Sequence, residues 1–302
     1  MNGISLIMAT IGRVDDVRRF VECLGAQTSR NFELIVVDQN PDDRLVPVLK
    51  KVTAMGVALL HIRQTEPNQC LARNLGLANA SMDVVAFPDD DCWYEPDTLE
   101  LVTQRMAQHD VPAGLVARWA EQDPSGKPAR RLELAKWRAF REVNASMITQ
   151  FYRRRELQLV DGFDPALGLH SWFGAGEEID LMFRMLARGA TVVYLPQALV
   201  HHAFSSGPGT GSWQVVCRSA RSRARGTGAL YAKHHLSTYV ILRGFIAPAV
   251  SPAFRLQGWK AVAKGFATAI GRIEGYSRWL GRSRTSPRER FDTSNPQRKD
   301  SS

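Results

Sequence analysis

The sequence predicts an α/β protein with a doubly wound sheet covered by helices on both faces, and three observations support this. Short apolar runs typical of buried strands alternate with helical patterns through the first third of the 302 residues. Polar residues follow several of these runs, at the position where such folds place their ligands. The fourth run, at residues 84–87, is followed by three acidic residues, Asp89, Asp90 and Asp91.

The first half of the chain alternates strand and helix in a regular order. Strands are predicted at residues 4–8, 32–37, 58–62 and 84–87, and helices at 14–24, 46–52 and 69–80. Pro96 then opens a further helical pattern. Helices between strands imply crossover connections, so these strands are predicted to form the parallel, nucleotide-binding part of the sheet.

The three neighbouring acids form the most informative stretch of the chain. Anions this close repel one another, so a cation is expected among them. Carboxylate oxygens suit Mg²⁺ or Mn²⁺, and these ions usually bind together with phosphates. The alternative is a solvated acidic turn, which the apolar strand before the cluster and Cys92 and Trp93 after it make less favourable.

Residues 87–93, Phe-Pro-Asp-Asp-Asp-Cys-Trp, resemble the Asp-x-Asp segment of family 2 glycosyltransferases, which have the GT-A fold. The likeness extends from Ile4 to about His235. It implies a GT-A domain with a mixed sheet at residues 1–235, divided into a nucleotide-binding half at 1–110 and an acceptor and catalytic half at 111–235. It also implies a nucleotide-sugar donor and an inverting transfer to a hydroxyl group of a growing surface polysaccharide or a lipid-linked acceptor.

Polar residues near the predicted strand ends are candidates for contacts to the donor. The resemblance implies that Asp38 contacts the nucleotide base and that Arg73, paired with Asn74, lies near the donor. A guanidinium also suits phosphate contacts. Taken singly, Asp38 is equally explained as a cap and Arg73 as a surface residue. The predicted donor-binding residues are Thr10, Arg13, Asp38, Arg73, Asp89 and Asp90.

His202 is the third predicted metal ligand. It follows a strand predicted at residues 190–195 and stands next to His201. A single histidine is more often structural, but the family carries a histidine at this position that completes the metal site. The resemblance thus implies a site for Mn²⁺ or Mg²⁺ formed by Asp89, Asp91 and His202, and imidazole is the better ligand for Mn²⁺.

A second acidic cluster opens a predicted helix in the acceptor half, where a glycine-rich segment precedes Glu177, Glu178 and Asp180. The helix dipole alone favours acids at this position. The segment also resembles the family's Glu-Asp motif, in which Glu178 falls where the catalytic Asp usually stands. The resemblance implies that Glu178 is the base that deprotonates the acceptor hydroxyl, with Glu177 as the alternative.

The composition favours an anionic partner, because the net charge is +9 and the isoelectric point is near 9.7. That partner is nucleotide phosphate, an anionic lipid surface or nucleic acid, but no nucleic-acid-binding motif is present, so nucleic acid is not predicted. Four scattered cysteines fit a reducing cytoplasm. The first residues lack signal-peptide features, and no run of about 18 apolar residues predicts a membrane span.

The last third of the chain differs from the rest in composition. Residues 205–212 are rich in glycine and form either a lid or a plain loop, and the arginines at 218–225 balance phosphate charge, face lipid headgroups or do neither. Residues 236–280 carry an aromatic and apolar stripe with basic residues beside it, which either binds the membrane surface or packs on the domain. Membrane binding implies a cytoplasmic protein that is peripheral at the inner face of the cell membrane. Residues 281–302 are predicted to be disordered.

Two questions stay open at the level of sequence. Residues 111–141 carry no clear pattern, and the next element, a strand at 144–151, is implied by the resemblance. The main alternative function is a nucleotidyltransferase acting on sugar phosphates, which also combines a doubly wound sheet with acidic metal ligands. Such an enzyme normally has a glycine-rich, basic phosphate loop near the amino terminus, and residues 9–13, Ala-Thr-Ile-Gly-Arg, match that loop poorly.

Overall fold

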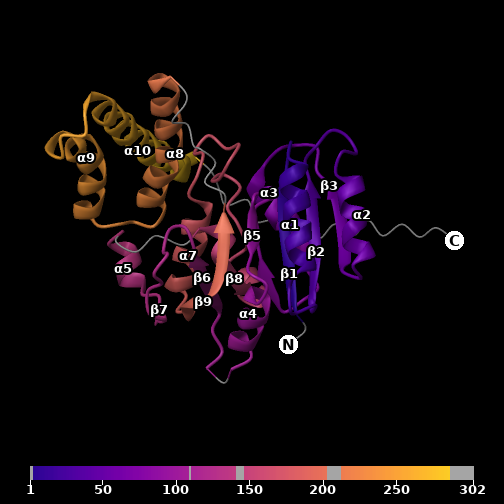
Figure 1. Ribbon diagram of the computed structural model, residues 1–302. Coiled ribbons are helices and arrows are strands. Elements are labelled where there is room, and N and C mark those ends of the chain that lie inside the picture. Colours follow the sequence, from indigo (N-terminus) through magenta and orange to yellow (C-terminus); the bar gives the residue numbers. More distant parts are fainter. Residues whose placement is uncertain (1–2, 109, 141–145, 203–211, 286–302) are drawn as a thin grey trace.

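The computed structural model describes residues 3–108, 110–140, 146–202 and 212–285. Within these residues the chain forms one sheet of nine strands in the order β3-β2-β1-β4-β8-β6-β9-β5, with β7 paired to β9. Helices cover both faces of the sheet, and three long helices form a further layer beside its second half (Figure 1). A doubly wound α/β fold with a mixed sheet is therefore confirmed.

The first half of the chain builds the parallel part of the sheet. Its strands and helices are β1 (Ile4–Thr10), α1 (Asp15–Gly25), β2 (Phe32–Asp38), α2 (Val46–Ala54), β3 (Ala58–Arg63), α3 (Gln69–Asn79), β4 (Val84–Ala86) and α4 (Thr98–Met106). Every element predicted here is present. β1 pairs in parallel with β2 and β4, with Thr10 opposite Asp38, so the polar residues that follow these strands gather at one edge.

Alternation along the strands divides the apolar core between the two faces of the sheet. Leu6 and Met8 of β1 face α1 and α2, whereas Ile7 faces α3, and all three side chains are fully buried. Gly76 of α3 allows close contact, since a Cβ there would lie 2.2 Å from the Ile7 side chain. Each fully buried side chain of this size contributes about 1.5–3 kcal/mol, so both layers hold the strand ends in fixed positions.

The second half adds strands of both directions. They are β5 (Cys92–Tyr94), β6 (Gly114–Trp119), β7 (Arg130–Arg131), β8 (Gln150–Arg153) and β9 (Val192–His202). The connecting helices are α5 (Leu134–Arg138), η1 (Met147–Thr149), α6 (Arg154–Gln158) and α7 (Glu177–Ala187). β8 is antiparallel to β4 and β6, whereas β9 is parallel to β6 and antiparallel to β5 and β7.

Several elements of this half differ from the prediction. β5, β6, β7 and α5 were not predicted, and β6 begins at Gly114, where a Cβ would lie 2.5 Å from the Tyr152 ring. The strand implied at 144–151 begins only at Gln150, because residues 147–149 form a 3₁₀ turn, and residues 144–145 lie outside the described part. The strand predicted at 190–195 extends to His202. Residues 205–211 of the glycine-rich segment also lie outside the described part.

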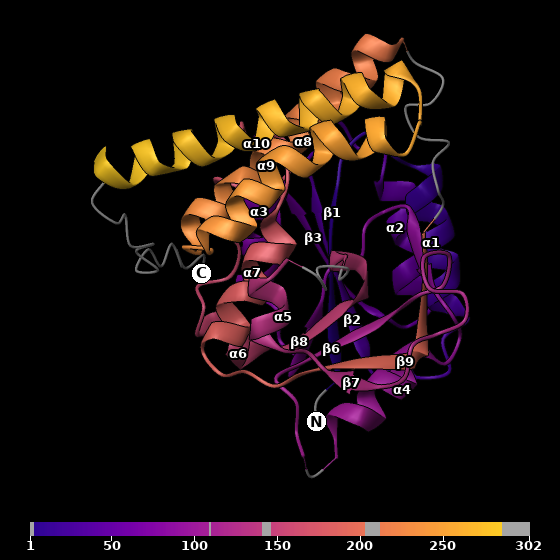
Figure 2. The same ribbon diagram turned by 90° about the vertical axis from the view of Figure 1, so that its left-hand side faces the viewer.

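The last three helices, α8 (Trp213–Lys233), α9 (Thr238–Phe254) and α10 (Trp259–Thr285), form a layer across the top of the sheet domain (Figure 2). α8 has no counterpart in the sequence prediction. α10 extends to Thr285, so the predicted disorder is wrong for residues 281–285, and residues 286–302 lie outside the described part. No helix in the described ranges combines the length and the apolar composition that crossing a membrane would need.

Glycines let these three helices approach one another at the level of the backbone. A Cβ at Gly228 of α8 would lie 1.9 Å from the carbonyl oxygen of Arg272 on α10. A Cβ at Gly265 of α10 would lie 2.0 Å from the carbonyl oxygen of Pro248 on α9. Because the distance between packed helices depends on the side chains at the contact, these positions bring the axes unusually close.

Candidate active site

The acidic cluster lies in the loop between β4 and β5, at the carboxyl edge of the sheet. β5 pairs with the end of β9, with Cys92 opposite His202. This register brings the imidazole to the cluster, and His202 Nε2 lies 2.9 Å from Asp91 Oδ1. The pairing of two strands more than 100 residues apart therefore assembles these side chains.

Asp89, Asp91 and His202, here called the Asp–His cluster, fit a divalent cation. Each offers one ligand atom, and the three atoms lie within 4.8 Å of one another. Two carboxylates and one imidazole form a donor set that suits Mn²⁺ better than Mg²⁺. Although burial alone would raise it, the pKa of Asp91 is lowered to about 2 by hydrogen bonds from His202 and Arg13. Asp91 therefore stays ionised, as a metal ligand must be.

Asp90 bonds toward β1 and differs in this from its two neighbours. Thr10 Oγ1 donates a hydrogen bond to Asp90 Oδ2 at 2.6 Å, and Arg13 Nη1 lies 3.2 Å from Asp90 Oδ1. Arg13 also bonds to Asp91. Burial raises the pKa of Asp90 to about 6. Asp90 thus ties the end of β1 to the end of β4, and Arg13 supplies positive charge beside the Asp–His cluster.

Asp38 lies at the end of β2 as predicted, but its carboxylate is fully buried and bonded within the protein. The backbone and side-chain nitrogens of Asn40 donate to it at 2.9 and 2.7 Å. His61 Nε2 and Arg63 Nη1, both on β3, lie 2.9 and 3.2 Å from its other oxygen. A cavity of about 420 Å³ opens beside this group and is lined by Asn40 and Arg63. A ligand there would meet the neighbours of Asp38 and not the carboxylate itself.

Arg73 connects the two acidic clusters. Its guanidinium donates to Asp89 Oδ1 at 3.0 Å and to Glu177 Oε1 at 3.2 Å, and its side chain is only 3% exposed. Asn74 beside it exchanges two hydrogen bonds of 2.8 Å with the backbone of Phe163. Arg73 therefore orients a carboxylate in each cluster and holds the end of α7 at a fixed distance from the metal candidates.

The two candidate bases begin α7, directly after a left-handed turn. Gly176 has a φ of 104°, a backbone conformation that residues other than glycine rarely adopt. Burial, followed by the charge of Glu177, raises the pKa of Glu178. A raised pKa suits a carboxylate to proton transfer near neutral pH. Glu177 differs because its carboxylate is bonded to Arg73.

Asp180, the third acid of this helix, has structural partners. Its carboxylate is fully buried and lies 2.9 Å from Arg184 Nε, 2.8 Å from Lys233 Nζ and 2.9 Å from His234 Nε2. Burial alone would raise the pKa of Asp180, but the charges of Lys233 and Arg184 and the hydrogen bond with His234 hold that pKa well below its usual range. Lys233 also bonds to Asp164 at 2.6 Å. The end of α8 is in this way fixed to the first turn of α7.

Aromatic residues just before α7 are held by the C-terminal helices. The Trp172 ring contacts two guanidinium groups, with Arg225 of α8 at 4.4 Å and Arg278 of α10 at 4.2 Å from its ring centroid. Phe173 packs edge-on against Trp279 of α10, with 5.3 Å between ring centroids. These contacts, here called the Trp172 clamp, fix the loop that leads into the candidate bases.

Comparison with known protein families identifies the chain. A family model described as Glycosyl transferase family 2 matches residues 5–165, more than half of the 302 residues. The chain belongs to glycosyl transferase family 2. The matched region contains Asp38, Arg73 and the three acids after β4, and it ends before Glu178 and His202.

Curated relatives of this family 2 chain match part of its length. Glycosyltransferase GlyA of Streptococcus pneumoniae serotype 4 is 28% identical over 113 residues, which are 37% of this chain and 16% of the relative. An uncharacterized glycosyltransferase of Haemophilus influenzae is 30% identical over 106 residues, 35% of either chain. The putative glycosyltransferase EpsH of Bacillus subtilis is 28% identical over 124 residues, 41% of this chain and 36% of the relative. The matches thus span little more than a third of these relatives, or less.

Solved structures resemble the family 2 chain over most of its length. The mannosyltransferase PcManGT from Pyrobaculum calidifontis, in complex with GDP-Man and Mn²⁺, has a TM-score of 0.64 at 15% identity, covering 92% of this chain and 86% of its own. TarS residues 1–349 of S. aureus has a TM-score of 0.54 at 15% identity and covers 91% of both chains. Identities this low show the fold alone, and the fold shared with these glycosyltransferases is the predicted GT-A fold.

The structure brings most of the predicted site residues of this family 2 chain close together. Asp89, Asp91 and His202 form one cluster, and Thr10, Arg13 and Asp90 adjoin it. Arg73 links the cluster to Glu177, the residue before Glu178 on α7. Asp38 lies apart, with β3. The residues that sequence reasoning missed are His61, Arg63, Lys233 and Trp172. His61 and Arg63 had a signal in their two-residue spacing along β3, which puts both on one face beside Asp38.

Proposed function

We propose that this chain is a metal-dependent, inverting glycosyltransferase that moves a sugar from a nucleotide-sugar donor to a hydroxyl group of an acceptor. The observation that carries the proposal is the bridge made by Arg73 between Asp89 of the Asp–His cluster and Glu177 at the start of α7. Inversion requires a leaving diphosphate on one side of the sugar and a base on the other. Through Glu177, the bridge holds the first turn of α7, which carries both candidate bases, at a fixed separation from the metal candidates, and family membership supports the chemistry.

Asp89, Asp91 and His202 would hold the metal ion, with Mn²⁺ favoured over Mg²⁺ by the imidazole. When bound, the ion would neutralise charge that develops on the leaving nucleoside diphosphate. Arg13, which bonds to Asp91 and is nearly half exposed, lies beside the same position and can contact phosphate oxygens. The PcManGT structure, which contains GDP-Man and Mn²⁺, supports this reading by analogy.

Glu178 would accept the proton of the acceptor hydroxyl as its oxygen attacks the anomeric carbon. The new glycosidic bond forms while the bond from the anomeric carbon to the phosphate oxygen breaks, and the nucleoside diphosphate leaves with that electron pair. Attack from the face opposite the leaving group inverts the anomeric centre. The raised pKa of Glu178 supports this role, because it brings the carboxylate closer to the range in which a general base works best. Glu177 remains the alternative base, although Arg73 holds it.

The nucleotide base would bind beside β2 and β3. The cavity of about 420 Å³ next to Asn40 and Arg63 has room for it. Asp38 would act indirectly there, because it fixes both of these side chains through its hydrogen bond and ion pair. Thr10, which bonds to Asp90, would fix the position of the diphosphate-binding part of the site relative to the part that binds the nucleotide base.

The C-terminal layer would attach the enzyme to the cytoplasmic face of the cell membrane. Residues 212–282 contain twelve Lys and Arg residues but one acid, Glu274. At the turn between α9 and α10, Phe254, Leu256 and Trp259 are 84%, 92% and 60% exposed, and we call them the α9–α10 tip. An apolar tip surrounded by basic side chains is typical of binding to anionic lipid surfaces.

This attachment suits a polysaccharide or lipid-linked acceptor. The proposal retains the division of the chain into a GT-A domain at residues 1–235 and a membrane-associating region at 236–280. The structure adds α8 to the region that packs together at the carboxyl end, since α10 lies against α8 at Gly228 and Gly275.

The nucleotidyltransferase alternative has less support. The turn after β1 contains a single glycine, Gly12, and its Arg13 bonds to the acids after β4. A phosphate loop instead presents several backbone N–H groups to the ligand. Family membership also favours sugar transfer.

The decisive experiment measures release of nucleoside diphosphate from a panel of nucleotide sugars in the presence of Mn²⁺. At least one donor should be hydrolysed slowly without acceptor, and the reaction should stop in excess chelator and in Asp91→Ala. Asp97→Ala, which removes a nearby exposed carboxylate, should behave like the wild type. Hydrolysis that continues in chelator or in Asp91→Ala would contradict metal dependence. Release of inorganic diphosphate when a nucleoside triphosphate and a sugar phosphate are mixed with the enzyme would favour the nucleotidyltransferase alternative.

A further inference from the structure

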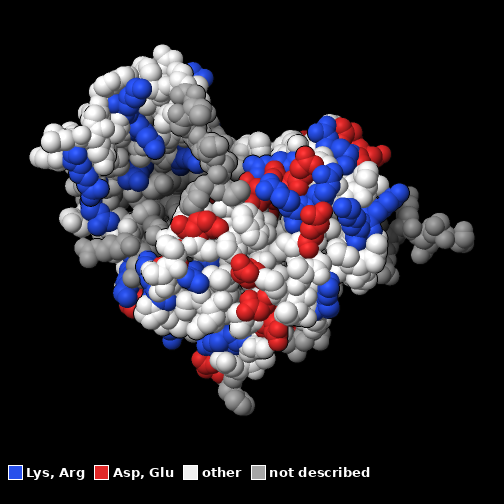
Figure 3. Space-filling model, in the orientation of Figure 1, with Lys and Arg blue, Asp and Glu red and all other residues white. Residues whose placement is uncertain are grey.

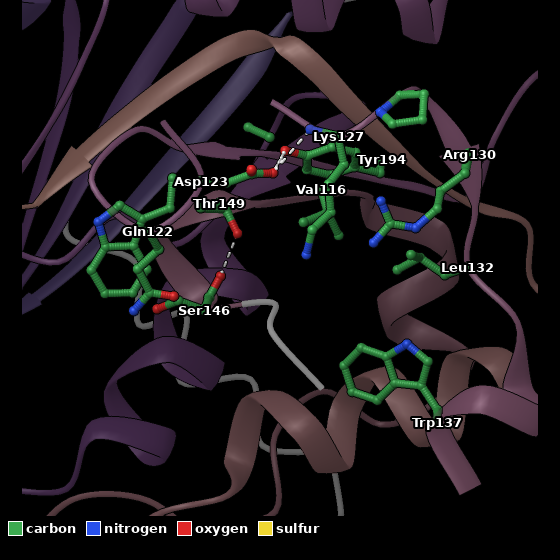
Figure 4. Close-up of a pocket in the computed structure, with 13 residues that line it drawn as sticks. Val116, Gln122, Asp123, Lys127, Arg130, Leu132, Trp137, Ser146, Thr149 and Tyr194 are labelled. Atoms are coloured by element: carbon green, nitrogen blue, oxygen red, sulfur yellow. Dashed lines mark hydrogen bonds between the residues drawn. The ribbon is translucent and has the colours of Figure 1, made fainter. Parts of the chain in front are cut away.

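A cavity of about 440 Å³ lies next to the Asp–His cluster and has no part in the mechanism above. It is lined by residues of β6, β7, β9 and α5 and of the segments 122–128 and 146–149 (Figure 4). Trp119, at the end of β6, lines this cavity and also contacts the His202 ring, with 5.5 Å between ring centroids. The cavity therefore adjoins the proposed reaction centre, and it is separate from the cavity beside Asn40 and Arg63.

Two walls of the cavity carry polar groups that are already fixed. Tyr194 donates a hydrogen bond to Asp123 Oδ2 at 2.8 Å, and the Lys127 backbone N–H donates to the same oxygen at 3.1 Å. The hydrogen bond from Tyr194 lowers the pKa of Asp123, so the carboxylate stays ionised. The Arg130 guanidinium lies 5.0 Å from the Tyr194 ring centroid. A hydrogen-bond acceptor and a cationic donor are thus in place before a ligand arrives.

Trp137 supplies a hydrogen-bond donor that is unpartnered among the residues that the structure describes. Its side chain is fully buried and lines the cavity, and its Nε1 has no hydrogen-bond partner in the described part of the chain. In Figure 4 the indole ring and the side chains of Gln122 and Ser146 lie on opposite sides of the group of lining residues. A buried N–H without a partner lowers stability, so a ligand oxygen in this cavity would remove a cost that the free protein bears.

The set of side chains favours a sugar ring over other ligands. A simple anion would meet the Asp123 carboxylate, and an apolar ligand would leave that carboxylate and the Trp137 N–H without partners. A sugar ring offers hydroxyl groups that both donate and accept, together with C–H faces that pack on aromatic rings such as those of Trp119 and Tyr194. The cavity volume is within the usual range for small-ligand sites.

We propose that this cavity, the Trp137 cavity, binds a sugar residue of the acceptor glycan close to the hydroxyl group that is extended. The inference rests on the proposed function, because it requires a glycan acceptor. It makes Trp137, Asp123 and Gln122 the side chains that determine which glycan is recognised. The donor sugar would meet other residues, those around the Asp–His cluster.

The inference is tested by saturation-transfer NMR with methyl glycosides of glucose, galactose, mannose and N-acetylglucosamine, without donor or metal. At least one glycoside should bind. Trp137→Phe keeps the ring and removes the N–H, so it should weaken that binding by about threefold to tenfold, the usual worth of one hydrogen bond. Gln122→Ala, at an exposed loop position that leaves the core intact, should weaken it by a similar factor. Gln104→Ala, at an exposed position on α4, is the matched control and should bind like the wild type.

Calorimetry with UDP and GDP in the presence of Mn²⁺, on the same proteins, separates this inference from the proposed function. Nucleotide binding should be equal in the wild type and all three variants. The inference is wrong if no glycoside binds, or if binding is unchanged in both Trp137→Phe and Gln122→Ala while their circular dichroism matches the wild type. Failure of the wild type to bind either nucleotide would contradict the proposed function, and a glycoside bound in the Trp137 cavity would still stand as a separate result.

Discussion

The carboxyl edge of the sheet and the C-terminal helical layer differ in charge and in the way their side chains are held. The edge gathers Asp89, Asp91, Glu177 and Glu178, and Arg73 joins the two pairs from a buried position. The layer carries twelve basic residues and one acid between 212 and 282, and large apolar side chains are exposed at the α9–α10 tip. Figure 3 shows basic side chains spread over the layer, while acidic ones gather on the sheet domain. The contrast supports a division between catalysis and attachment to an anionic surface.

The two regions are nevertheless joined at the candidate bases. Lys233 and His234 at the end of α8 bond to Asp180 in the first turn of α7, and the Trp172 clamp holds the loop before that turn. A change in the layer can therefore reach the chemistry by displacing α7. Variants of the two regions should show how far the division holds.

The largest effect is expected for Glu178→Gln, which keeps the size of the side chain and removes the proton acceptor. Turnover should fall by about two to four powers of ten, the usual worth of general-base catalysis. Calorimetric binding of nucleoside diphosphate and of anionic liposomes should hardly change, because neither uses this carboxylate.

Glu177→Gln is the matched comparison and should lose less activity, since its hydrogen bond to Arg73 can be kept by the amide oxygen. If Glu178→Gln turns over normally and Glu177→Gln is inactive, the base is one residue earlier. Activity in both variants would leave helix-dipole compensation as the better account of these acids.

The second effect concerns pH. A base must be deprotonated to act, so kcat/KM should fall about tenfold per pH unit below the pKa of Glu178. Because burial raises that pKa, the fall should begin above the ordinary range for Glu, which is about 4.3. A profile of kcat/KM measured from acidic to neutral pH checks this, and Glu178→Gln should not show this fall on the acidic side. A fall that begins only in the ordinary pKa range of a carboxyl group would mean that a solvated acid is the base.

A third effect isolates the layer. Leu256→Glu puts a charge on the most exposed apolar side chain of the α9–α10 tip, so binding to anionic liposomes should weaken by at least about tenfold. Turnover of a soluble acceptor should stay at the wild-type level. Val111→Glu, at an exposed apolar position of the sheet domain, should leave liposome binding unchanged.

This point substitution is a cleaner test than removal of the whole tail, because deleting α10 also removes Arg278 and Trp279 from the Trp172 clamp. Liposome binding of the wild type should also weaken as salt is added, since part of the attraction is screened charge. Equal liposome binding by the wild type and Leu256→Glu would mean that the α9–α10 tip is not the surface that attaches the protein to lipid.

The smallest effect is expected for Trp172→Leu, and this variant tests the joint between the regions. Loss of two cation–π contacts should lower stability by about 1–2 kcal/mol. Hydrogen exchange should rise in the loop before α7, and turnover should fall several-fold because the base is held less firmly. Trp172→Phe keeps an aromatic face and should restore most of both properties. If exchange and turnover are unchanged in Trp172→Leu, the layer does not support the bases.

Local patterns predicted the first half of the fold because each strand and helix there carries its own apolar period. The Asp–His cluster was predictable from the acids after β4 and from the family's histidine. The bridging role of Arg73 was not, because it depends on where α3 meets α7, far apart in sequence. α8 was missed for a related reason, since small residues such as Gly226 and Gly228 form its contacts and no apolar stripe marks the helix.

The backbone contacts among α8, α9 and α10 bear on how this sequence can change over generations. Gly228, Gly265 and Gly275 each face a main-chain carbonyl, which cannot rotate out of the way as a side chain can. Alanine is the better helix former by about 1 kcal/mol, yet even its methyl group would force the helices apart. The basic residues on the outside can exchange among themselves without disturbing these contacts. Descendants of this chain can therefore exchange basic residues on the outer surface of the layer, while the angle at which its helices cross stays fixed by the hydrogen atoms of these glycines and of Gly271, which faces the carbonyl of Arg221.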